Sequence, residues 1–463
     1  MVRVRTVTDP AHDRNPVIWM LLLALLACVL TLLIGLVGAV VYTRYEPLLR
    51  SMGVTFQQLR PIHETYAFAW VFLGGVTVIH FFLLTTFGPF EPAARRRFRA
   101  QCVLWAAAGA GTFITLSIGQ FTGREYLGYH PIFSLIILAG WLLFARNYFG
   151  LVGFRLRGRP VYIYMWSVAI PLFVVTYLEG HLYLLEQVSA QPVRDIALQW
   201  KSNGVMVGSF NLLAYGSLMY IAGLIRKDDG YSYSRTAFGL FTVGVLNTFT
   251  NYGHHTYHLP QTPWIHWIAF VVSMLETIIL AKVLFDLLGL RRAPSMPDDL
   301  RVPERFVRAA MLWTFLMLLL SLLIAIPPLN AFIHGTHVVV AHSMGSMLGI
   351  NSMILLGAFA YAMRSLKGAE HPVVKGARVR SAVPWVNLFL GVFWLAFLAR
   401  GLAAAMVRYL GPSAPDYSLV VQAFPPVVLI SGAGLVLSLL WIFSQWVLAL
   451  WRPVPLQDSS SAP

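Results

Sequence analysis

Histidine and methionine side chains gather where an otherwise apolar stretch of the chain begins. The residues read His334-Gly-Thr-His337-Val-Val-Val-Ala-His342-Ser-Met344, and we expect the apolar helix that they open to run to about Met363. Such polar side chains are costly to place in lipid and need a partner that stabilises them, for which a metal cofactor is the natural candidate. His342 and Met344 point about 200° apart on a regular helix. One helix is therefore expected to hold two cofactors, one on each side.

A second group of histidines precedes a proline, in the segment Gly253-His254-His255-Thr-Tyr-His258-Leu-Pro260. Pro260 suits a helix stop. Adjacent histidines diverge by about 100° on a regular helix, so His254 and His255 can reach one metal only if it sits beside a helix end. His254 and His258, one helical turn apart, form the rival pair. Spacing alone leaves both pairs open.

Isolated polar residues mark three further apolar stretches. Glu276, in Ser273-Met-Leu-Glu276, is a carboxylate in mid-membrane and should face the interior of a helix bundle, because exposure to lipid is expensive. His63 lies at the mouth of a helix, where an interfacial position is the plain alternative to a ligand role. Glu179 and His181 lie at a membrane boundary, where polar side chains can simply face water.

The elements that must position these residues are membrane helices. With 58% hydrophobic and 11% charged residues, the 463-residue chain cannot be a soluble globular protein of ordinary composition. Apolar windows of about 20 residues, the length that crosses roughly 30 Å of hydrocarbon, recur from end to end. They predict an all-α polytopic membrane protein, residues 1–463 forming one membrane domain of twelve helices. The helices are expected near residues 17–42, 61–86, 101–119, 130–148, 161–183, 202–225, 235–258, 262–289, 306–328, 332–363, 383–405 and 420–450.

The net charge of +15 reflects membrane topology rather than nucleic-acid binding, because the basic residues follow alternate helices. By the positive-inside rule both termini are cytoplasmic, and the even-numbered helices run from outside to inside. The long first apolar run has no cleavage site and is expected to be a membrane helix. Cys28 and Cys102 fall within apolar spans, which argues against a disulfide or a thiolate metal site. Basic residues that set this orientation include Arg3, Arg5, Arg14, Arg95, Arg96, Arg97, Arg291 and Arg292.

This orientation places four histidines at one depth. His63 and His342 lie early in helices that enter from outside, while His254 and His255 lie late in a helix that ends there. All four should therefore lie in the outer part of the bilayer. The orientation was obtained from the charges alone, so the shared depth independently supports one joint site.

The histidine motifs resemble those of the heme-copper oxidase superfamily, and the chain is identified as a catalytic subunit of that kind. The likeness rests on His63 in helix 2, the Gly-His-His of helix 7 and the pattern His-x-Thr-x-x-Val-Val-Ala-His of helix 10. It implies that His63 and Met344 ligate a low-spin heme and that His342 ligates a high-spin heme. Met344 departs from the family's histidine. Propionate-binding residues implied by the resemblance are His334, Arg400 and Arg408; interfacial snorkelling is the alternative for the two arginines.

The same resemblance assigns His254 and His255 to a non-heme metal. The family's third histidine, on helix 6, has no counterpart, because no histidine occurs between His181 and His254. The sequence leaves the additional ligand open between Gln199, Asn203, His181 and Glu276. Glu276 resembles the glutamate of the nitric oxide reductase branch, which serves as a metal ligand or a proton relay.

The implied function is that of a nitric oxide reductase catalytic subunit, which reduces two NO to N2O and water. Two hemes of type b and one non-heme metal are expected, iron rather than copper because a carboxylate such as Glu276 is a hard ligand. Electrons would come from a separate cytochrome c or copper-bearing subunit. The expected location is the bacterial cytoplasmic membrane, with lipid as the surrounding partner and no nucleic acid bound.

Two alternatives belong to other functional classes. One is an oxygen-reducing terminal oxidase in which Tyr252 or Tyr257 serves as an electron and proton donor. The other is a non-catalytic heme-binding sensor or assembly subunit that has lost its non-heme metal together with the helix 6 histidine.

Overall fold

The computed structural model describes residues 16–289 and 296–451, and this part of the chain is helical with no strand. Arg3, Arg5, Arg14, Arg291 and Arg292 lie outside the described residues. Eleven helices in the described ranges are long and apolar enough to cross a membrane, which confirms an all-α, multi-pass membrane protein. Ten of them are α1 (Pro16–Val40), α3 (Phe56–Phe87), α4 (Pro92–Ser117), α5 (Pro131–Val152), α6 (Val161–Glu179), α8 (Pro192–Arg226), α10 (Pro263–Gly289), α11 (Arg301–Ala325), α16 (Ala377–Leu410) and α17 (Ser418–Trp451).

The remaining span, His337–Lys367, is built from three segments and departs from the single regular helix predicted over 332–363. A separate short helix, α12 (Pro327–Ile333), precedes it, and a turn through Gly335 at φ +71° leads into the first segment, α13 (His337–Met344). The chain then follows a π-helix over Gly345–Ser352 and returns to an α-helix in α14 (Met353–Lys367). Stretches of π-helix are rare in proteins, and those that occur are often found at functional sites.

The seventh predicted span corresponds to α9 (Arg235–Thr250), which has only 16 residues and is not among the eleven long apolar helices. It ends earlier than the predicted 235–258, because the chain tightens into a 3-10 turn over Asn251–His254. His254 and His255 therefore lie beyond the α-helix rather than within its last turn. Beyond the end of the helix, the side chains of two adjacent histidines need not point about 100° apart, as they would on a regular helix.

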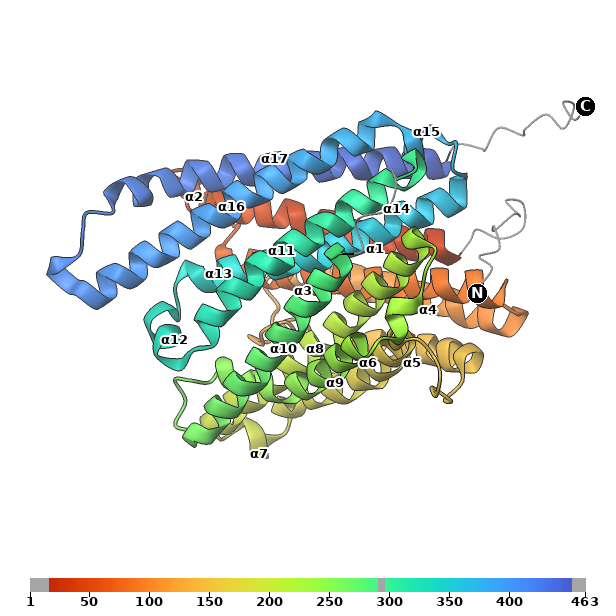
Figure 1. Ribbon diagram of the computed structural model, residues 1–463. Helices are drawn as coiled ribbons and strands as arrows, with labels where there is room; N and C mark the ends of the chain where they lie inside the picture. Colours follow the sequence, from red (N-terminus) through yellow and green to blue (C-terminus); the bar gives the residue numbers. More distant parts are fainter. Residues whose placement is uncertain (1–15, 290–295, 452–463) are drawn as a thin grey trace, which may run out of the picture.

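Short helices lie at both ends of the bundle. Figure 1 shows α2 (Glu46–Ser51), α7 (Glu186–Ser189) and α12 toward one end and α15 (Pro372–Lys375) at the other. The helices α2 and α7 fall in loops predicted on the outer side of the membrane, and α12 covers the junction between the two spans predicted over 306–328 and 332–363. The helix α15 falls in a loop predicted on the cytoplasmic side.

The most buried spans are those that carry the candidate ligands or adjoin them. Within its apolar window α3 is 78% buried, α8 is 78% buried and the α13–α14 span is 83% buried, whereas α10 is only 6% buried and faces outward along most of its surface. An aromatic cluster of Phe72, Trp141 and Phe173 joins α3 to α5 and α6. The polar residues of α3, α8 and α13 are consequently held inside a packed bundle.

Glycines set the close packing of α13 and of the π-helix that follows it. A Cβ atom at Gly401 on α16 would lie 2.2 Å from the backbone nitrogen of Val338, so the two helices touch through backbone. Gly345 and Gly349 likewise face Met317 and Trp313 of α11 with no room for a side chain. The segment that carries His342 is thus fixed by α11 and α16 on one side.

Candidate functional site

His342 and Met344 lie on α13, the regular helix that precedes the π-helix. Ala341 is fully buried against the neighbouring helices, Ser343 is exposed, and His342 and Met344 are half-buried on either side. The His342 Nδ1 atom is buried and has no hydrogen-bond partner among the described residues. Since α13 is an ordinary α-helix up to Met344, the two side chains retain the separation of about 200° expected from their spacing.

His63 is oriented by α1. Its Nδ1 atom lies 2.9 Å from the carbonyl oxygen of Thr31 and must donate to it, since a carbonyl only accepts. This close approach depends on Gly35, where a Cβ would lie 2.8 Å from the imidazole Cε1. Nε2 of His63 is thereby left as an acceptor, which is the state of a metal-binding histidine whose other nitrogen donates to a backbone carbonyl.

His254 and His255 point toward different helices. The Nδ1 atom of His254 lies 3.0 Å from the Tyr257 hydroxyl, and its Nε2 lies 2.7 Å from the Ser273 hydroxyl on α10. His255 is exposed, and its ring stacks on Trp200 of α8 with centroids 4.7 Å apart and an interplanar angle of 3°. Each imidazole is thus held in place by contact with a neighbouring helix.

The end of α9 and the helix α13 come together at this site. His342 interacts electrostatically with both His254 and His255, although it lies almost ninety positions later in the chain. His258, the rival partner of His254, instead packs its ring 5.1 Å from that of His334. The structure therefore brings His342 within electrostatic range of the adjacent pair, and it packs His258 on His334, which also lies within range of His255.

His334 precedes α13 at the outer end. Its carbonyl oxygen accepts a hydrogen bond of 2.9 Å from Arg408 of α16. Burial lowers the pKa of His334, because it disfavours the charged imidazolium. The neighbouring His258 and Arg408 lower this pKa further, because they repel a positive charge at His334. Arg400 lies half-buried on the same helix and interacts with His337, whose ring packs against Tyr42, Phe397 and Phe424.

Two of the candidates for an additional metal ligand on or near helix 6, His181 and Gln199, are engaged with other partners. Both ring nitrogens of His181 are occupied, one by the Tyr177 carbonyl at 2.6 Å and one by the Ser134 hydroxyl at 2.7 Å. Gln199 accepts from Arg124, and Asn203 is buried with its amide nitrogen unpartnered. In the described residues no three His, Cys, Asp or Glu side chains are placed to share a metal ion.

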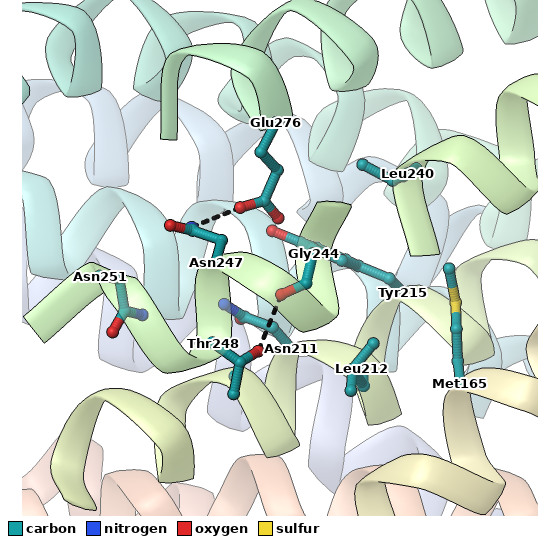
Figure 2. A pocket seen from close by; sticks show the side chains of 11 residues that line it. Met165, Asn211, Leu212, Tyr215, Leu240, Gly244, Asn247, Thr248, Asn251 and Glu276 are labelled. Carbon is teal, nitrogen blue, oxygen red and sulfur yellow. Dashed lines mark hydrogen bonds between the residues drawn. The ribbon is translucent and has the colours of Figure 1, made fainter. Parts of the chain in front are cut away.

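Glu276 extends from α10 toward α9, as Figure 2 shows. Its carboxylate accepts a hydrogen bond from the amide nitrogen of Asn247. The amide oxygen of Asn247 accepts from the Ser273 hydroxyl at 2.9 Å, and that hydroxyl is the group beside His254 Nε2. A continuous hydrogen-bonded chain therefore runs from Glu276 through Asn247 and Ser273 to His254.

A small cavity of about 30 Å³ adjoins Glu276 between α6, α8, α9 and α10. Polar groups of Asn211, Tyr215 and Asn251 line it together with Glu276, and the amide oxygen of Asn251 is buried without a partner. A cavity of this size has room for about two water molecules, each of which needs two or more polar partners. The lining supplies such partners, so the cavity is suited to ordered water.

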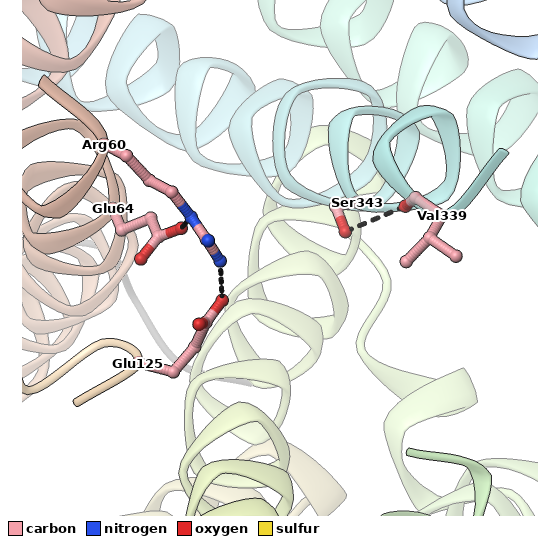
Figure 3. Close-up of polar contacts among 5 residues, drawn as sticks. All are labelled: Arg60, Glu64, Glu125, Val339 and Ser343. Carbon is pink, nitrogen blue, oxygen red and sulfur yellow. Dashed lines mark hydrogen bonds and ion pairs between the residues drawn. The ribbon is translucent and has the colours of Figure 1, made fainter. Parts of the chain in front are cut away.

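Charged residues form the outer rim near α3. Arg60 pairs with Glu64 and with Glu125, both at 2.6 Å, and Figure 3 shows this cluster opposite Ser343 of α13. The Ser343 hydroxyl donates back to the carbonyl of Val339. The exposed Ser343 hydroxyl, between His342 and Met344, is thus satisfied within its own helix.

The donor set fits the cofactors that the sequence motifs imply. His63 Nε2 is available as an acceptor, His342 keeps a buried nitrogen unpartnered, and Met344 offers a thioether on the opposite face of the same helix. These groups match axial ligands of two hemes. His254 and His255 would supply two imidazoles to a non-heme metal, and the described residues place no third His, Cys, Asp or Glu side chain with them to share a metal ion.

Sequence reasoning did not find two residues that connect the site. Thr31 orients His63, and Asn247 joins Ser273 to Glu276. An asparagine in the middle of an apolar span was the one signal available, since such a residue is costly in lipid without a partner. Thr31 is unremarkable in sequence, and its role depends on a backbone carbonyl.

Two comparisons with known proteins bear on this arrangement. Residues 15–437 match the protein family described as cytochrome c and quinol oxidase polypeptide I. The fold is similar to that of a heme-copper terminal oxidase dimer solved by cryo-EM, with a TM-score of 0.69 and 14% sequence identity. That alignment covers 95% of this chain and 85% of the other. At 14% sequence identity, this structural similarity establishes a shared fold only.

Proposed function

The chain belongs to the cytochrome c and quinol oxidase polypeptide I family, and from that premise we propose that it is the catalytic subunit of a membrane-bound nitric oxide reductase. The family makes it a heme-dependent oxidoreductase of the heme-copper superfamily. The proposal adds the substrate: two molecules of NO are reduced by two electrons and two protons to N2O and water. The proposed location is a bacterial cytoplasmic membrane.

The observation that carries the proposal is the chain that links Glu276 to His254. Two arrangements of protons satisfy every contact along it. In one, His254 Nε2 donates to Ser273, which donates to Asn247, whose amide donates to the ionised Glu276. In the other, the Asn247 amide is rotated by 180°. Its oxygen then accepts from a protonated Glu276, its nitrogen donates to Ser273, and Ser273 donates to Nε2 of His254. The two differ by one proton moved between His254 and Glu276.

This chain supports a proton-relay role for Glu276. With Nε2 of His254 committed to a metal, Ser273 becomes the last member of the chain and holds a proton beside the site. The water-sized cavity on the other side of Glu276 can resupply the carboxyl group, because Tyr215 and Asn251 line it. A reduction that consumes protons needs such a donor close to the bound substrate.

The cofactors proposed here follow the donor set. The hemes supply electrons and a coordination position for NO, and the non-heme metal supplies a Lewis acid beside it. His63 and Met344 would hold the low-spin heme, His342 the high-spin heme, and His254 with His255 the non-heme metal. Glu276 makes iron the proposed non-heme metal, because a hard carboxylate oxygen suits iron better than copper(I). His334, Arg400 and Arg408 remain proposed propionate partners.

Electron supply is proposed to come from a separate cytochrome c or copper-bearing subunit at the outer end. His63, the proposed ligand of the low-spin heme, lies on α3 next to Glu64, which pairs with Arg60 at the charged rim. Lipid surrounds the outward faces of helices such as α10.

One contact favours a second candidate, an oxygen-reducing oxidase. The Tyr257 hydroxyl lies 3.0 Å from His254 Nδ1, so a redox-active tyrosine would sit next to the proposed metal ligand. This hydroxyl is also hydrogen-bonded to the Ala325 carbonyl at 2.7 Å, which commits its proton. A donor tyrosine must release that proton, so the contact that locates Tyr257 also opposes the role.

The experiment that tests the proposal measures NO consumption and O2 uptake on one purified preparation supplied with the same reductant. NO consumption with N2O formation and little O2 uptake is the expected result. O2 uptake with little NO consumption would transfer the assignment to the oxidase. Retention of heme with neither activity would indicate a sensor or assembly subunit.

A further inference from the structure

We propose that the start of α4, the end of α5 and the loop after α5 form a binding surface for anionic phospholipid headgroups. In Figure 1 these ends of α4 and α5 lie toward the same end of the bundle as α15, where the sequence predicts the cytoplasmic side. The inference concerns how the chain contacts its membrane and does not depend on the reaction that it catalyses. The arginine surface, as we call it, consists of Arg96, Arg97, Arg146, Arg155, Arg157 and Arg159.

A buried asparagine joins the two helices at the arginine surface and orients one of its members. Nε of Arg97 donates to the amide oxygen of Asn147 at 2.7 Å, and the amide nitrogen of Asn147 donates to the carbonyl of Ala94 at 3.0 Å. Because Asn147 is buried, it holds the Arg97 guanidinium in one orientation. The terminal nitrogens of Arg97 have no hydrogen-bond partner among the described residues, so they are available to a phosphate group, which a guanidinium can bind through two parallel bonds.

Membrane topology alone does not account for the arginine surface. Topology requires basic residues on this side of the membrane, but it does not require that they lack acidic partners. Around α11, α14 and α15 the basic side chains are paired with carboxylates. These pairs are Arg301 with Asp298 at 2.9 Å, Arg308 with Glu304, Arg364 with Asp299 at 2.6 Å, and Lys375 with Glu370 at 2.5 Å.

The six arginines of the arginine surface differ from these pairs. None of them forms an ion pair with a carboxylate in the part of the chain that the structure describes, and all except the half-buried Arg97 are exposed. Their positive charge is therefore left for a partner outside the chain. Charge complementarity makes that partner an anion.

The loop after α5 adds an apolar side chain to this charge. Phe154 is 81% exposed, and its ring stacks on Phe149 with centroids 4.9 Å apart and an interplanar angle of 10°. The loop turns on both sides of the arginines, at Gly153 with φ +75° and at Gly158 with φ +77°. An aromatic ring beside arginines suits the boundary between headgroups and acyl chains. A small soluble anion offers no apolar surface to such a ring, so the anion that fits is a lipid.

The chemistry of the lipid follows from the charge. Clusters of about four to eight basic residues on the cytoplasmic side attract anionic lipids, and each basic residue near such a surface strengthens binding roughly fivefold. A zwitterionic lipid carries the same phosphate without net negative charge. We therefore expect the arginine surface to retain phosphatidylglycerol in preference to phosphatidylcholine.

The test neutralises the loop by combining Arg155→Gln, Arg157→Gln and Arg159→Gln in the full-length protein. Phosphatidylglycerol or phosphatidylcholine is titrated into the purified, detergent-solubilised protein, and the lipid that remains bound per chain after gel filtration is measured by mass spectrometry. The wild type should retain phosphatidylglycerol saturably. The triple variant should need about 100-fold more of it for half-saturation, because three contributions of roughly fivefold are lost. Glycerol 3-phosphate, a soluble phosphate ester without acyl chains, should not displace the bound lipid.

The matched control combines Arg301→Gln, Arg308→Gln and Lys375→Gln, which removes the same charge from residues that have acidic partners. It should retain phosphatidylglycerol as the wild type does. Arg97→Gln is a second test variant that keeps the comparison decisive if the triple variant does not fold, and it should raise the half-saturating concentration roughly fivefold. Wild-type retention in the test variants would overturn the proposal, and so would an equal loss in the control. Equal retention of both lipids, or displacement by an equal concentration of glycerol 3-phosphate, would also overturn it.

Discussion

The imidazole Nε2 of His254 lies 2.7 Å from the hydroxyl oxygen of Ser273, and this contact joins the end of α9 to the face of α10 that carries Glu276. Ser273 and Glu276 are three positions apart and therefore lie on one side of α10. Asn247, one helix away, hydrogen-bonds to both. A carboxyl group and a proposed metal ligand on different helices are thus linked by two intervening side chains.

Glu276→Gln keeps the shape of the side chain and removes its ionisable group. Turnover of NO should fall at least about 100-fold, within the range that general acid-base groups contribute. Heme content should persist, because the proposed heme ligands lie on α3 and α13. The check is N2O formation per heme in detergent. Wild-type turnover with both hemes present would leave Glu276 a buried structural acid and would remove the residue that most favours NO over O2.

Asn247→Leu interrupts the chain between Glu276 and Ser273 with a side chain of similar size. Proton transfer along the chain then lacks a bridge, and NO turnover should fall by at least about 10-fold, as with other groups that support a metal site. Thr242→Val is the control on the same helix, since the exposed Thr242 hydroxyl donates to the backbone carbonyl of Phe238 in its own helix and lies away from the cavity. Equal rates in the two variants would show that the chain does not carry the protons.

Met344→His should change the low-spin heme from histidine–methionine to bis-histidine ligation. Its reduction potential should fall, because a thioether ligand raises the potential relative to a second imidazole. Redox titration of the low-spin heme absorption provides the measurement. A potential and spectrum identical to those of the wild type would remove Met344 from the site and leave the second axial ligand to another residue.

Metal analysis of the wild-type enzyme should find two hemes and one additional iron per chain. The expected iron-to-heme ratio is therefore about 1.5, with copper absent, because the carboxylate of Glu276, which the chain through Asn247 and Ser273 links to His254, is a hard oxygen donor. Pyridine hemochrome analysis gives the heme count and elemental analysis gives both metals. One copper per chain would favour the oxidase, and a single heme would contradict the assignment of His63 and His342 to separate cofactors.

Gly401→Ala should destabilise the protein through the contact between α16 and α13. The added Cβ would lie 2.2 Å from the backbone nitrogen of Val338, and relieving this overlap should cost about 1–3 kcal/mol. The thermal unfolding midpoint should fall, and release of the high-spin heme should accompany it. Gly391→Ala on the same helix is the control, because nothing lies within 4 Å of its Cβ position. A midpoint that does not fall below that of the control would show that α13 can shift without cost.

The sequence by itself determined the class of fold and most of the candidate ligands. Apolar windows and alternating basic loops are local properties, and each window of about 20 residues can cross the membrane whatever its neighbours do. The Gly-His-His segment and the His342 segment were visible for the same reason, since histidine is rare in lipid-facing helices. The family match over residues 15–437 agrees with that interpretation.

Only the tertiary structure decided how these residues are connected. The end of α9 at Thr250 and the π-helix over Gly345–Ser352 depend on packing against neighbouring helices, which a periodic pattern does not encode. The pairing of His258 with His334 and the chain from Glu276 to His254 join segments that are distant in sequence or lie on different helices. Thr31 and Ala325 act through backbone carbonyls, which every residue possesses, so their identity carries no signal until the helices are in place.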